Sequence, residues 1–538
     1  MKAHVRRAGQ PLRISVVTDA GLMEDWQKAG VSVQLEEEDG DGRLSVRISS
    51  AAEAVKWVVL RWEEDLRMAE SFFGDALERG YGNLGWRGMD GQRVMPWYFL
   101  AAFGNCTRAY GVETGASAFC FWQADSAGVT LWLDVRNGGA GVELGGRTLT
   151  AAVVIWKEYR DCSPFEAAVA FCKAMCPAPL KVEGPLVGSN NWYYAYGDIT
   201  ESSVLADTDY IVKLMDGSGV KPYMVIDDGW QIDHEIDGYN GGPWKESNDR
   251  FPDMGALAEK IRAKGARPGI WIRPLSDERT ELPEEWRLPH TGYLDPSHPD
   301  ALDYITGNIA QLCVWGYELV KYDFVTYDLF GRWGFQMRPS VTADGWHFHD
   351  RSLTSAEVVK KLYEAIRKVT EPYGTVLIGC NAIGHLCAGL VHANRTGDDT
   401  SGRYWEVTRV TGVNTLAFRL CQHGTFYCAD ADCVGITDRI DWQKNRQWTD
   451  LLARSGTALF VSVRPGSLPE AEEAELSAML KEACAGTHHA VPEDWMYRNC
   501  PECWTDGDQE LHYDWYDDAG LGLLMDGIRV EQLPGSAF

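Results

Sequence analysis

Val225-Ile226-Asp227-Asp228-Gly229-Trp230 is a short apolar run that ends in two carboxylates and an indole. The run has the length of a buried strand, and the acidic pair stands where that strand would end. Leu319-Val320-Lys321-Tyr322-Asp323 repeats this composition, and Asn394-Arg395-Thr396-Gly397-Asp398-Asp399 places two acids after an arginine. Amphipathic stretches of helical length, such as residues 299–312, separate these runs. The alternation predicts repeated β–α units and a parallel sheet.

Eight short apolar runs of this kind occur after residue 188, at residues 191–194, 223–227, 269–272, 319–323, 376–380, 390–395, 425–428 and 458–462. Eight β–α units match a (β/α)8 TIM barrel, although the segment between the fifth and sixth runs is too short for a full helix. A capping box at Thr354 and Glu357 marks the start of one of the intervening helices. A doubly wound open sheet is the alternative.

The segments on either side of the barrel have a different periodicity. Up to about residue 156, apolar residues alternate, as in Leu44, Val46 and Ile48, which predicts an N-terminal antiparallel β-sandwich. Ser163 and Glu166 form a second capping box, and prolines follow that helix as a linker. The aromatic C-terminal stretch predicts a small β appendage. The expected domains are 1–160 (sandwich), 161–188 (connecting helix and linker), 189–482 (catalytic barrel) and 483–538 (small C-terminal β domain).

Charge and cysteine content narrow the possible partners. The chain has 51 basic and 78 acidic residues and a net charge of −27, so its surface repels nucleic acid and anionic lipid. The 14 cysteines are unevenly spaced, which indicates free thiols and a reducing compartment. We find neither a secretory leader nor an apolar run of membrane-spanning length, and therefore expect a cytoplasmic protein. The sequence is compatible with a homo-oligomer and does not specify the oligomeric state.

Cys500-Pro501-Glu502-Cys503 has the spacing of a zinc knuckle. Structural zinc needs four ligands, and no second pair with matching spacing lies nearby. We expect neither a metal nor a cofactor. His385, His392 and His423 lack the spacing of a shared metal site and are expected to be structural.

Catalytic groups of a parallel barrel lie at the carboxyl ends of its strands, so the acids after three runs converge on one mouth. An aspartate in that position is often only the N-cap of the next helix, but three clusters at one end favour a site. Burial and neighbouring charges separate carboxyl pKa values, and one ionised and one protonated carboxyl are what glycoside hydrolysis requires. The 22 tryptophans could also supply flat faces for sugar rings, although most should fill the core.

Several motifs, in order, resemble the retaining α-galactosidases and α-N-acetylgalactosaminidases of glycoside hydrolase families 27 and 36, most closely family 36. The resemblance covers about residues 186–465, together with a sandwich that precedes a barrel. The motifs are residues 225–231, Lys321-Tyr322-Asp323-Phe324, Arg395-x-x-x-Asp399, Gly269-Ile270-Trp271 with Pro274, Leu294-Asp295-Pro296 with His298-Pro299, and Asp430-Ala431-Asp432-Cys433.

The resemblance implies an exo-acting hydrolase that removes terminal α-galactosyl residues by double displacement. Asp323 would be the nucleophile and Asp399 the general acid and base, with Asp398 the less favoured neighbour. The two carboxyls of a retaining enzyme stand about 5–5.5 Å apart. Asp227 and Asp228 would accept hydrogen bonds from the sugar's 4- and 6-hydroxyls, and Trp271 or Trp192 would form an apolar wall of the sugar pocket. The implied substrate-binding residues are Asp227, Asp228, Lys321, Arg395, Trp271, Trp192, Cys380, Asn381 and Trp230.

Three features leave the specificity open. Cys380-Asn381-Ala382-Ile383-Gly384 replaces the Cys-Ser-Gly-Gly-Gly-like turn that faces the sugar's 2-substituent in family 36. The strand-one segment and the shorter sandwich also depart from the family. An α-N-acetylgalactosaminidase or a transglycosylase with the same catalytic pair is therefore an alternative.

Two rivals come from other classes of protein. A binding protein that has lost catalysis is disfavoured because both catalytic aspartates are present. A barrel enzyme that holds Mg²⁺ with Asp227, Asp228 and Asp432 is disfavoured because adjacent aspartates point to opposite faces of a strand.

Overall fold

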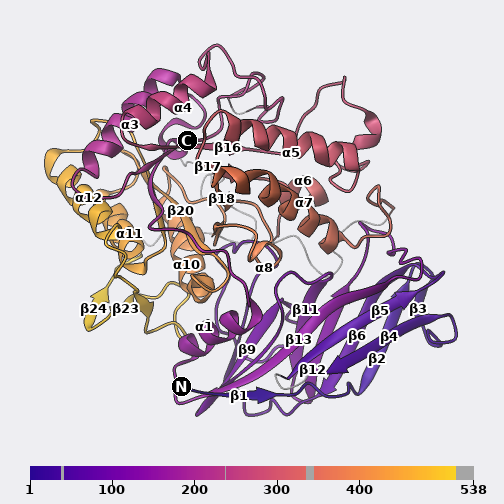
Figure 1. The fold of residues 1–538 in the computed structure, drawn as a ribbon. Helices are drawn as coiled ribbons and strands as arrows, with labels where there is room; N and C mark the ends of the chain where they lie inside the picture. The colour runs from indigo at the N-terminus through magenta and orange to yellow at the C-terminus, as the bar shows by residue number, and fades with distance from the viewer. Residues whose placement is uncertain (38–41, 237, 335–344, 517–538) are drawn as a thin grey trace, which may run out of the picture.

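The computed structural model describes residues 1–37, 42–236, 238–334 and 345–516 (Figure 1). It consists of two N-terminal antiparallel sheets, a closed barrel of eight parallel strands and a small C-terminal sheet. This confirms the predicted fold class, with a barrel in place of the open sheet. The domain limits at residues 160, 188 and 482 remain a proposed division.

The N-terminal sandwich joins a seven-stranded and a six-stranded sheet. Ring pairs from opposite sheets form its core, with centroids 5.6 Å apart for Trp62 and Trp156 and 5.9 Å for Phe99 and Trp122. The first sheet contains β1 (Lys2–Arg6), β4 (Val31–Glu37), β5 (Arg43–Ser50), β7 (Ser71–Gly74), β9 (Tyr98–Phe103), β10 (Cys106–Val112) and β13 (Thr148–Arg160). The second contains β2 (Arg13–Thr18), β3 (Gly21–Met23), β6 (Val55–Glu63), β8 (Met95–Pro96), β11 (Phe119–Asp125) and β12 (Gly128–Asp134).

The barrel closes through parallel pairing of its first and last strands. Its strands are β14 (Val187–Asn190), β15 (Tyr223–Ile226), β16 (Arg267–Ile272), β17 (Leu319–Tyr322), β18 (Val376–Gly379), β19 (Ala393–Arg395), β20 (Cys428–Ile436) and β21 (Ala458–Val463). The helices are α1 (Pro164–Met175), α2 (Trp192–Ala195), α3 (Glu201–Leu214), α4 (Met254–Ala263), α5 (Pro299–Val314), α6 (Val325–Phe330), α7 (Ser355–Thr370), α8 (Gly384–Cys387), α9 (Trp405–Val407), α10 (Asn414–Arg419), α11 (Trp442–Ser455) and α12 (Glu470–Ala483).

The predicted first strand was wrong. Residues 192–195 form the helical turn α2, and the strand is the preceding β14. The sequence of β14 is Val-Gly-Ser-Asn, which is not an apolar run; a Cβ on Gly188 would lie 2.2 Å from the carbonyl oxygen of Tyr223 in the neighbouring strand. Close strand approach therefore selects glycine here, and the hydrophobic pattern does not reveal the strand. The seventh strand likewise begins at Cys428 rather than at residue 425.

Other local predictions agree with the structure. Both predicted capping boxes are confirmed, at the start of α1 and of α7. The segment between β18 and β19 holds only the four-residue α8. The C-terminal sheet consists of β22 (Val491–Pro492), β23 (Cys503–Asp506) and β24 (Gln509–His512), and residues 517–538 of the predicted appendage lie outside the described residues.

Sandwich and barrel share one hydrophobic core. Phe73 of β7 packs on Phe418 of α10 at 5.7 Å between centroids, and Trp97 stacks on His385 of α8 at 4.6 Å. Figure 1 shows α1 at this junction, between the sandwich strands and the barrel. Within the described ranges, every helix is too short or too polar to cross a membrane.

Candidate active site

The end of β15 places Asp227 against two other strands of the barrel. Its Oδ2 accepts hydrogen bonds from Asn190 Nδ2 at 2.6 Å and from Lys321 Nζ at 2.9 Å. Burial opposes the charge of Lys321, but Asp227 outweighs it and raises the lysine's pKa well above its usual value. Lys321 is therefore a fixed positive charge inside the barrel, next to Asp227.

Asp323 directly follows β17 and carries one hydrogen bond on each carboxylate oxygen. The backbone N–H of Phe324 donates to Oδ1 at 2.7 Å, and the indole N–H of Trp271 donates to Oδ2 at 3.2 Å. Phe324 has φ 58°, a left-handed conformation that turns its N–H back toward the carboxylate. Both donors stabilise the negative charge of this carboxylate and fix its orientation.

Arg395 ends β19 and is fully buried among charged partners. Its Nη2 lies 3.2 Å from Oδ1 of Asp399 and 2.8 Å from Oδ2 of Asp432, and its Nη1 donates to Cys380 Sγ at 3.3 Å. Burial alone would raise the pKa of Asp432, but the charges of Arg395 and Lys321 bring it below its usual value. Asp432 thus holds the arginine that contacts Asp399.

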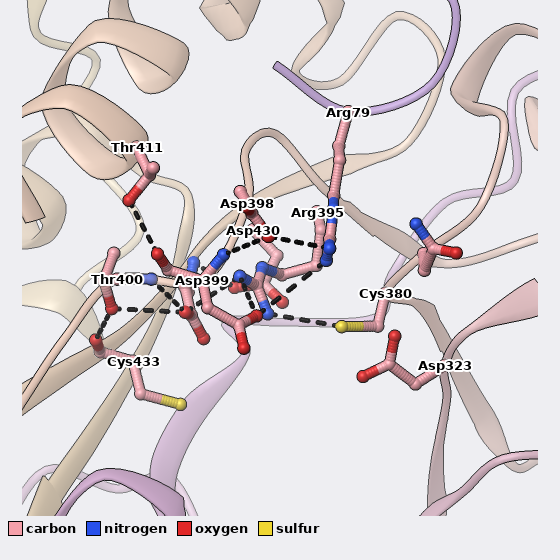
Figure 2. Close-up of polar contacts among 12 residues, drawn as sticks. Arg79, Asp323, Cys380, Arg395, Asp398, Asp399, Thr400, Thr411, Asp430 and Cys433 are labelled. Atoms are coloured by element: carbon pink, nitrogen blue, oxygen red, sulfur yellow. Dashed lines mark hydrogen bonds and ion pairs between the residues drawn. The ribbon is translucent and has the colours of Figure 1, made fainter. Parts of the chain in front are cut away.

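The open carboxylate of this loop is Asp399. Its side chain is 53% exposed, whereas that of Asp398 is 18% exposed and forms an ion pair of 2.7 Å with Arg79. Figure 2 shows Asp399 and Asp323 on either side of the contact between Arg395 and Cys380. The preference for Asp399 over Asp398 as the acid stays a prediction.

The sandwich also reaches the site, which the sequence analysis missed. Glu78 and Arg79 lie in the long connection between β7 and β8; Arg79 contacts both acids of the β19 loop, at 2.7 Å for Asp398 and 3.8 Å for Asp399. Glu78 is fully buried, and burial raises its pKa to about 7. No periodicity marks a sandwich loop that inserts into a barrel, and the only local signal is a charged pair beside Gly80 and Gly82.

Two of the predicted substrate contacts have their polar groups bonded inside the protein. Asn381 is fully buried: its Nδ2 donates to Glu78, and its Oδ1 accepts from the backbone of Tyr327 at 2.9 Å. Trp230 is also fully buried, and its indole N–H donates to the carbonyl of Trp271 at 3.0 Å. Both side chains thus support neighbouring loops, and their role in substrate binding stays a prediction.

The remaining predicted residues lie around the same mouth. Asp228 Oδ1 accepts from Gln231 Nε2 at 2.6 Å and lies 3.2 Å from His234 Nδ1. Trp192 of α2 is half-buried and packs on Tyr196 at 5.4 Å between centroids. Cys380 is buried, and burial, with the charge of Asp323, raises its pKa well above the usual value.

The three histidines singled out in the sequence are structural. Burial lowers the pKa of His385 to about 3 and those of His392 and His423 to about 4, so all three are neutral near pH 7. Each ring bonds a backbone group: that of Val112, Leu377 or Ala429.

No group of three or more His, Cys, Asp or Glu side chains suited to a metal ion occurs in the part of the chain that the structure describes. Asp227 and Asp432, two of the three aspartates of the magnesium alternative, each pair with a buried cation instead. Cys500 Sγ is 3.1 Å from Arg409 Nη1, and Cys503 Sγ is 3.5 Å from His512 Nδ1.

Solved structures of known proteins share this architecture. An α-galactosidase from Thermus thermophilus, in complex with p-nitrophenyl α-D-galactopyranoside, matches with a TM-score of 0.59 and 17% identity over 90% of this chain and 97% of its own. A second complex of that enzyme contains stachyose and matches at 18% identity over 84% and 96% of the two chains, with a TM-score of 0.59. The chain has the fold of an α-galactosidase.

A family 36 α-galactosidase from Geobacillus stearothermophilus matches with a TM-score of 0.58 and 14% identity over 90% of this chain and 73% of its own. At the level of sequence, comparison with protein-family models and with curated proteins gives no match. The similarity therefore establishes the fold of the chain.

Proposed function

We propose that the protein is a retaining α-galactosidase of the family 36 type, which removes terminal α-galactosyl residues from small carbohydrates. The observation that carries the proposal is the pairing of two unlike carboxylates around Cys380. Asp323 is fixed by two N–H donors, whereas Asp399 is exposed and is held through one oxygen by Arg395, which also contacts Cys380. A held nucleophile and an open acid are the two groups that a retaining glycosidase needs.

The reaction would proceed in two displacements. In the first, an oxygen of Asp323 attacks the anomeric carbon, the bond from that carbon to the glycosidic oxygen breaks, and Asp399 gives its proton to the departing oxygen. In the second, Asp399 takes a proton from water, the water oxygen attacks the same carbon, and the bond to Asp323 breaks. The sugar leaves with its α configuration, and both aspartates return to their starting states.

Asp227, Asp228 and Lys321 would bind the hydroxyls of the sugar. They are buried and already ordered by protein contacts, so little entropy is lost when they accept or donate a hydrogen bond to the substrate. Trp192 and Trp271 would line the apolar side of the ring. The fold relatives crystallised with α-galactosides support a galactose-shaped pocket.

We favour a hydroxyl over an N-acetyl group at the sugar's 2-position. Asn381, the polar side chain of the loop expected to face this position, is committed to Glu78 and to the backbone of Tyr327. It is therefore not free to bind an acetamido group. The α-N-acetylgalactosaminidase alternative becomes the second outcome of the test below.

The test is a proton NMR time course of hydrolysis of p-nitrophenyl α-D-galactopyranoside and of its N-acetylgalactosamine counterpart. We expect release of the α-anomer of galactose first, followed by mutarotation, and turnover of the galactoside well above that of the other substrate. Release of the β-anomer would contradict the retaining mechanism. Faster cleavage of the N-acetylgalactosaminide would assign the alternative specificity.

We also place the enzyme in the cytoplasm. All 14 cysteines are free thiols, and most are buried, which suits a reducing compartment.

A further inference from the structure

We infer that Arg79, a residue of the sandwich, is a positioning residue for the general acid Asp399 of the barrel. The inference rests on the proposed function, because it concerns the acid of that reaction. It makes the catalytic site a product of two domains rather than of the barrel alone.

Arg79 holds Asp399 both directly and through its neighbour. Its Nη1 lies 3.8 Å from Oδ1 of Asp399, and its Nη2 lies 2.7 Å from Oδ1 of Asp398 (Figure 2). The same oxygen of Asp398 accepts the backbone N–H of Asp399 at 2.9 Å. The arginine thereby restrains the side chain and the backbone of the proposed acid together.

The contacts to Asp399 are confined to one oxygen. Arg395 and Arg79 both approach Oδ1, and the hydrogen bonds and ion pairs of this carboxyl among the described residues all involve that atom. The other oxygen, Oδ2, is left to carry the proton and to face the glycosidic oxygen. Two cations on one side of a half-exposed carboxyl thus select one orientation of its plane.

Arg79 is itself held in place. Its side chain is 4% exposed, it lies 3.5 Å from Glu78 Oε1, and its guanidinium carbon is 5.3 Å from the ring centre of Trp333. Next to it, Gly80 donates to the carbonyl of Thr396 at 2.8 Å and accepts from the N–H of Asp398 at 2.9 Å. The sandwich segment is thus bonded to the β19 loop through backbone and side chain, and these contacts hold the guanidinium group of Arg79 beside the two aspartates.

Loss of Arg79 should impair the protonation of the leaving group more than the attack by Asp323. p-Nitrophenolate is a good leaving group and departs with little protonation, so the rate on p-nitrophenyl α-D-galactopyranoside should fall little in an Arg79 variant. Methoxide is a poor leaving group, so the rate on methyl α-D-galactopyranoside should fall strongly. A misplaced acid costs up to about 100-fold in rate. A structural role alone would lower both activities equally.

The experiment compares kcat and kcat/KM on both substrates for the wild type, Arg79→Met, Arg79→Lys and Asp399→Asn. We expect Arg79→Met to lose about 10- to 100-fold more activity on the methyl glycoside than on the nitrophenyl glycoside. This is the same selective pattern as that of Asp399→Asn, but weaker. Arg79→Lys keeps the positive charge but not the two-pronged guanidinium group. Its selective loss of activity on the methyl glycoside should therefore be smaller than that of Arg79→Met.

Arg147→Met is the matched control, because Arg147 also joins the sandwich to the barrel, through Glu357 of α7, but contacts neither catalytic aspartate. It should lower both activities equally or not at all. Equal losses on both substrates in Arg79→Met, or the selective pattern in Arg147→Met, would overturn the assignment. Thermal unfolding shows whether Arg79→Met is folded; if it is not, Arg79→Lys must show the selective loss. A wild type inactive on both substrates would reject the proposed function instead.

Discussion

At the scale of single residues, Asp323 depends on its chain neighbour. A left-handed Phe324 costs of order 1–3 kcal/mol and persists because the surrounding structure enforces it. That conformation directs the Phe324 N–H onto Oδ1 of Asp323, opposite the indole N–H on Oδ2. The local strain is thus coupled to the orientation of the proposed nucleophile.

Replacement of Asp323 by asparagine should nearly abolish turnover while the protein still folds. Asp323→Asn removes the anionic oxygen that forms the covalent bond, and kcat on p-nitrophenyl α-D-galactopyranoside should fall by several orders of magnitude. Only one of the two N–H donors keeps an acceptor, so the free energy of unfolding should fall by about 1–3 kcal/mol. Steady-state kinetics and urea unfolding measure the two effects. A rate near that of the wild type would remove Asp323 from its assigned role.

Not every residue of the candidate site could be found from the sequence. Polar residues after apolar runs, such as Asp227, Asp323 and Arg395, were predictable because parallel strands bring their ends to one rim. Arg79 was not, because it comes from a loop of another domain far away in the sequence. The motifs predict Trp230 and Asn381 as substrate contacts, and no sequence signal shows that their polar groups also bond inside the fold.

At the scale of elements, the loop after β19 depends on close packing at Gly397. A Cβ on this glycine would lie 2.1 Å from the carbonyl oxygen of Thr411 and 2.4 Å from Thr415 Oγ1. The Thr411 hydroxyl in turn donates to the carbonyl of Asp399 at 2.8 Å. The helical segment after the loop and the loop that carries the proposed acid Asp399 are therefore packed closely against one another.

Gly397→Ala should accordingly displace the acid loop. We expect a loss of at least about 10-fold in kcat/KM and of about 1–3 kcal/mol in the free energy of unfolding, because a backbone oxygen cannot move aside as a flexible side chain can. The control is Gly88→Ala, at a site where an added Cβ would meet no atom within 4 Å. Kinetics and urea unfolding of both variants test the prediction, which fails if the two behave alike.

Elements were predicted from the sequence where hydrophobic burial defines them. All four residues of β17 are buried, and α7 buries one apolar face, so the sequence pattern located both elements. β14 was missed because close approach of its neighbour selects glycine, and its polar end points to the site. The hydrophobic pattern reveals which residues are buried. It does not reveal an element whose residues are determined by close packing or by the chemistry of the site.

Helix α3 carries a buried acid, Asp207, that makes stability depend on pH. Tyr194 donates to its Oδ2 at 2.5 Å, while Oδ1 has no hydrogen-bond partner among the described residues. Burial raises its pKa from 3.8 to about 7. Between these values the folded protein keeps a proton that the unfolded chain has lost, so this residue lowers stability as the pH rises from about 4 to 7.

Asp207→Asn removes this dependence. We expect the variant to be more stable than the wild type by about 2–4 kcal/mol at pH 8 and by only about 1 kcal/mol at pH 4.5. Urea unfolding at the two pH values measures the difference. Asp209→Asn, on the same helix but with a side chain 62% exposed, is the control and should show no such pattern. A gain in stability that is the same at both pH values would contradict the buried-acid explanation.

At the scale of the whole molecule, one apolar core continues from the sandwich into the barrel. Phe73 lies on the sandwich side of the junction, is fully buried, and packs on Phe418 at 5.7 Å and on Trp495 at 5.1 Å. Arg79 and Arg147 add ion pairs across the same junction. Because the apolar core continues between the domains, neither can unfold without exposing the other's core surface.

We therefore expect a single calorimetric transition, with a van't Hoff enthalpy equal to the calorimetric enthalpy, and loss of activity at the same temperature. Phe73→Ala removes a junction side chain at a cost of about 3–5 kcal/mol and should lower the temperature of that one transition. Trp57→Ala, which removes a half-buried ring of β6 that packs on Phe121 and Trp132 of its own sheet, is the comparison: it should also leave a single transition. Two resolved transitions in the wild type, with activity following only one of them, would show that the domains unfold independently and that the junction does not couple them.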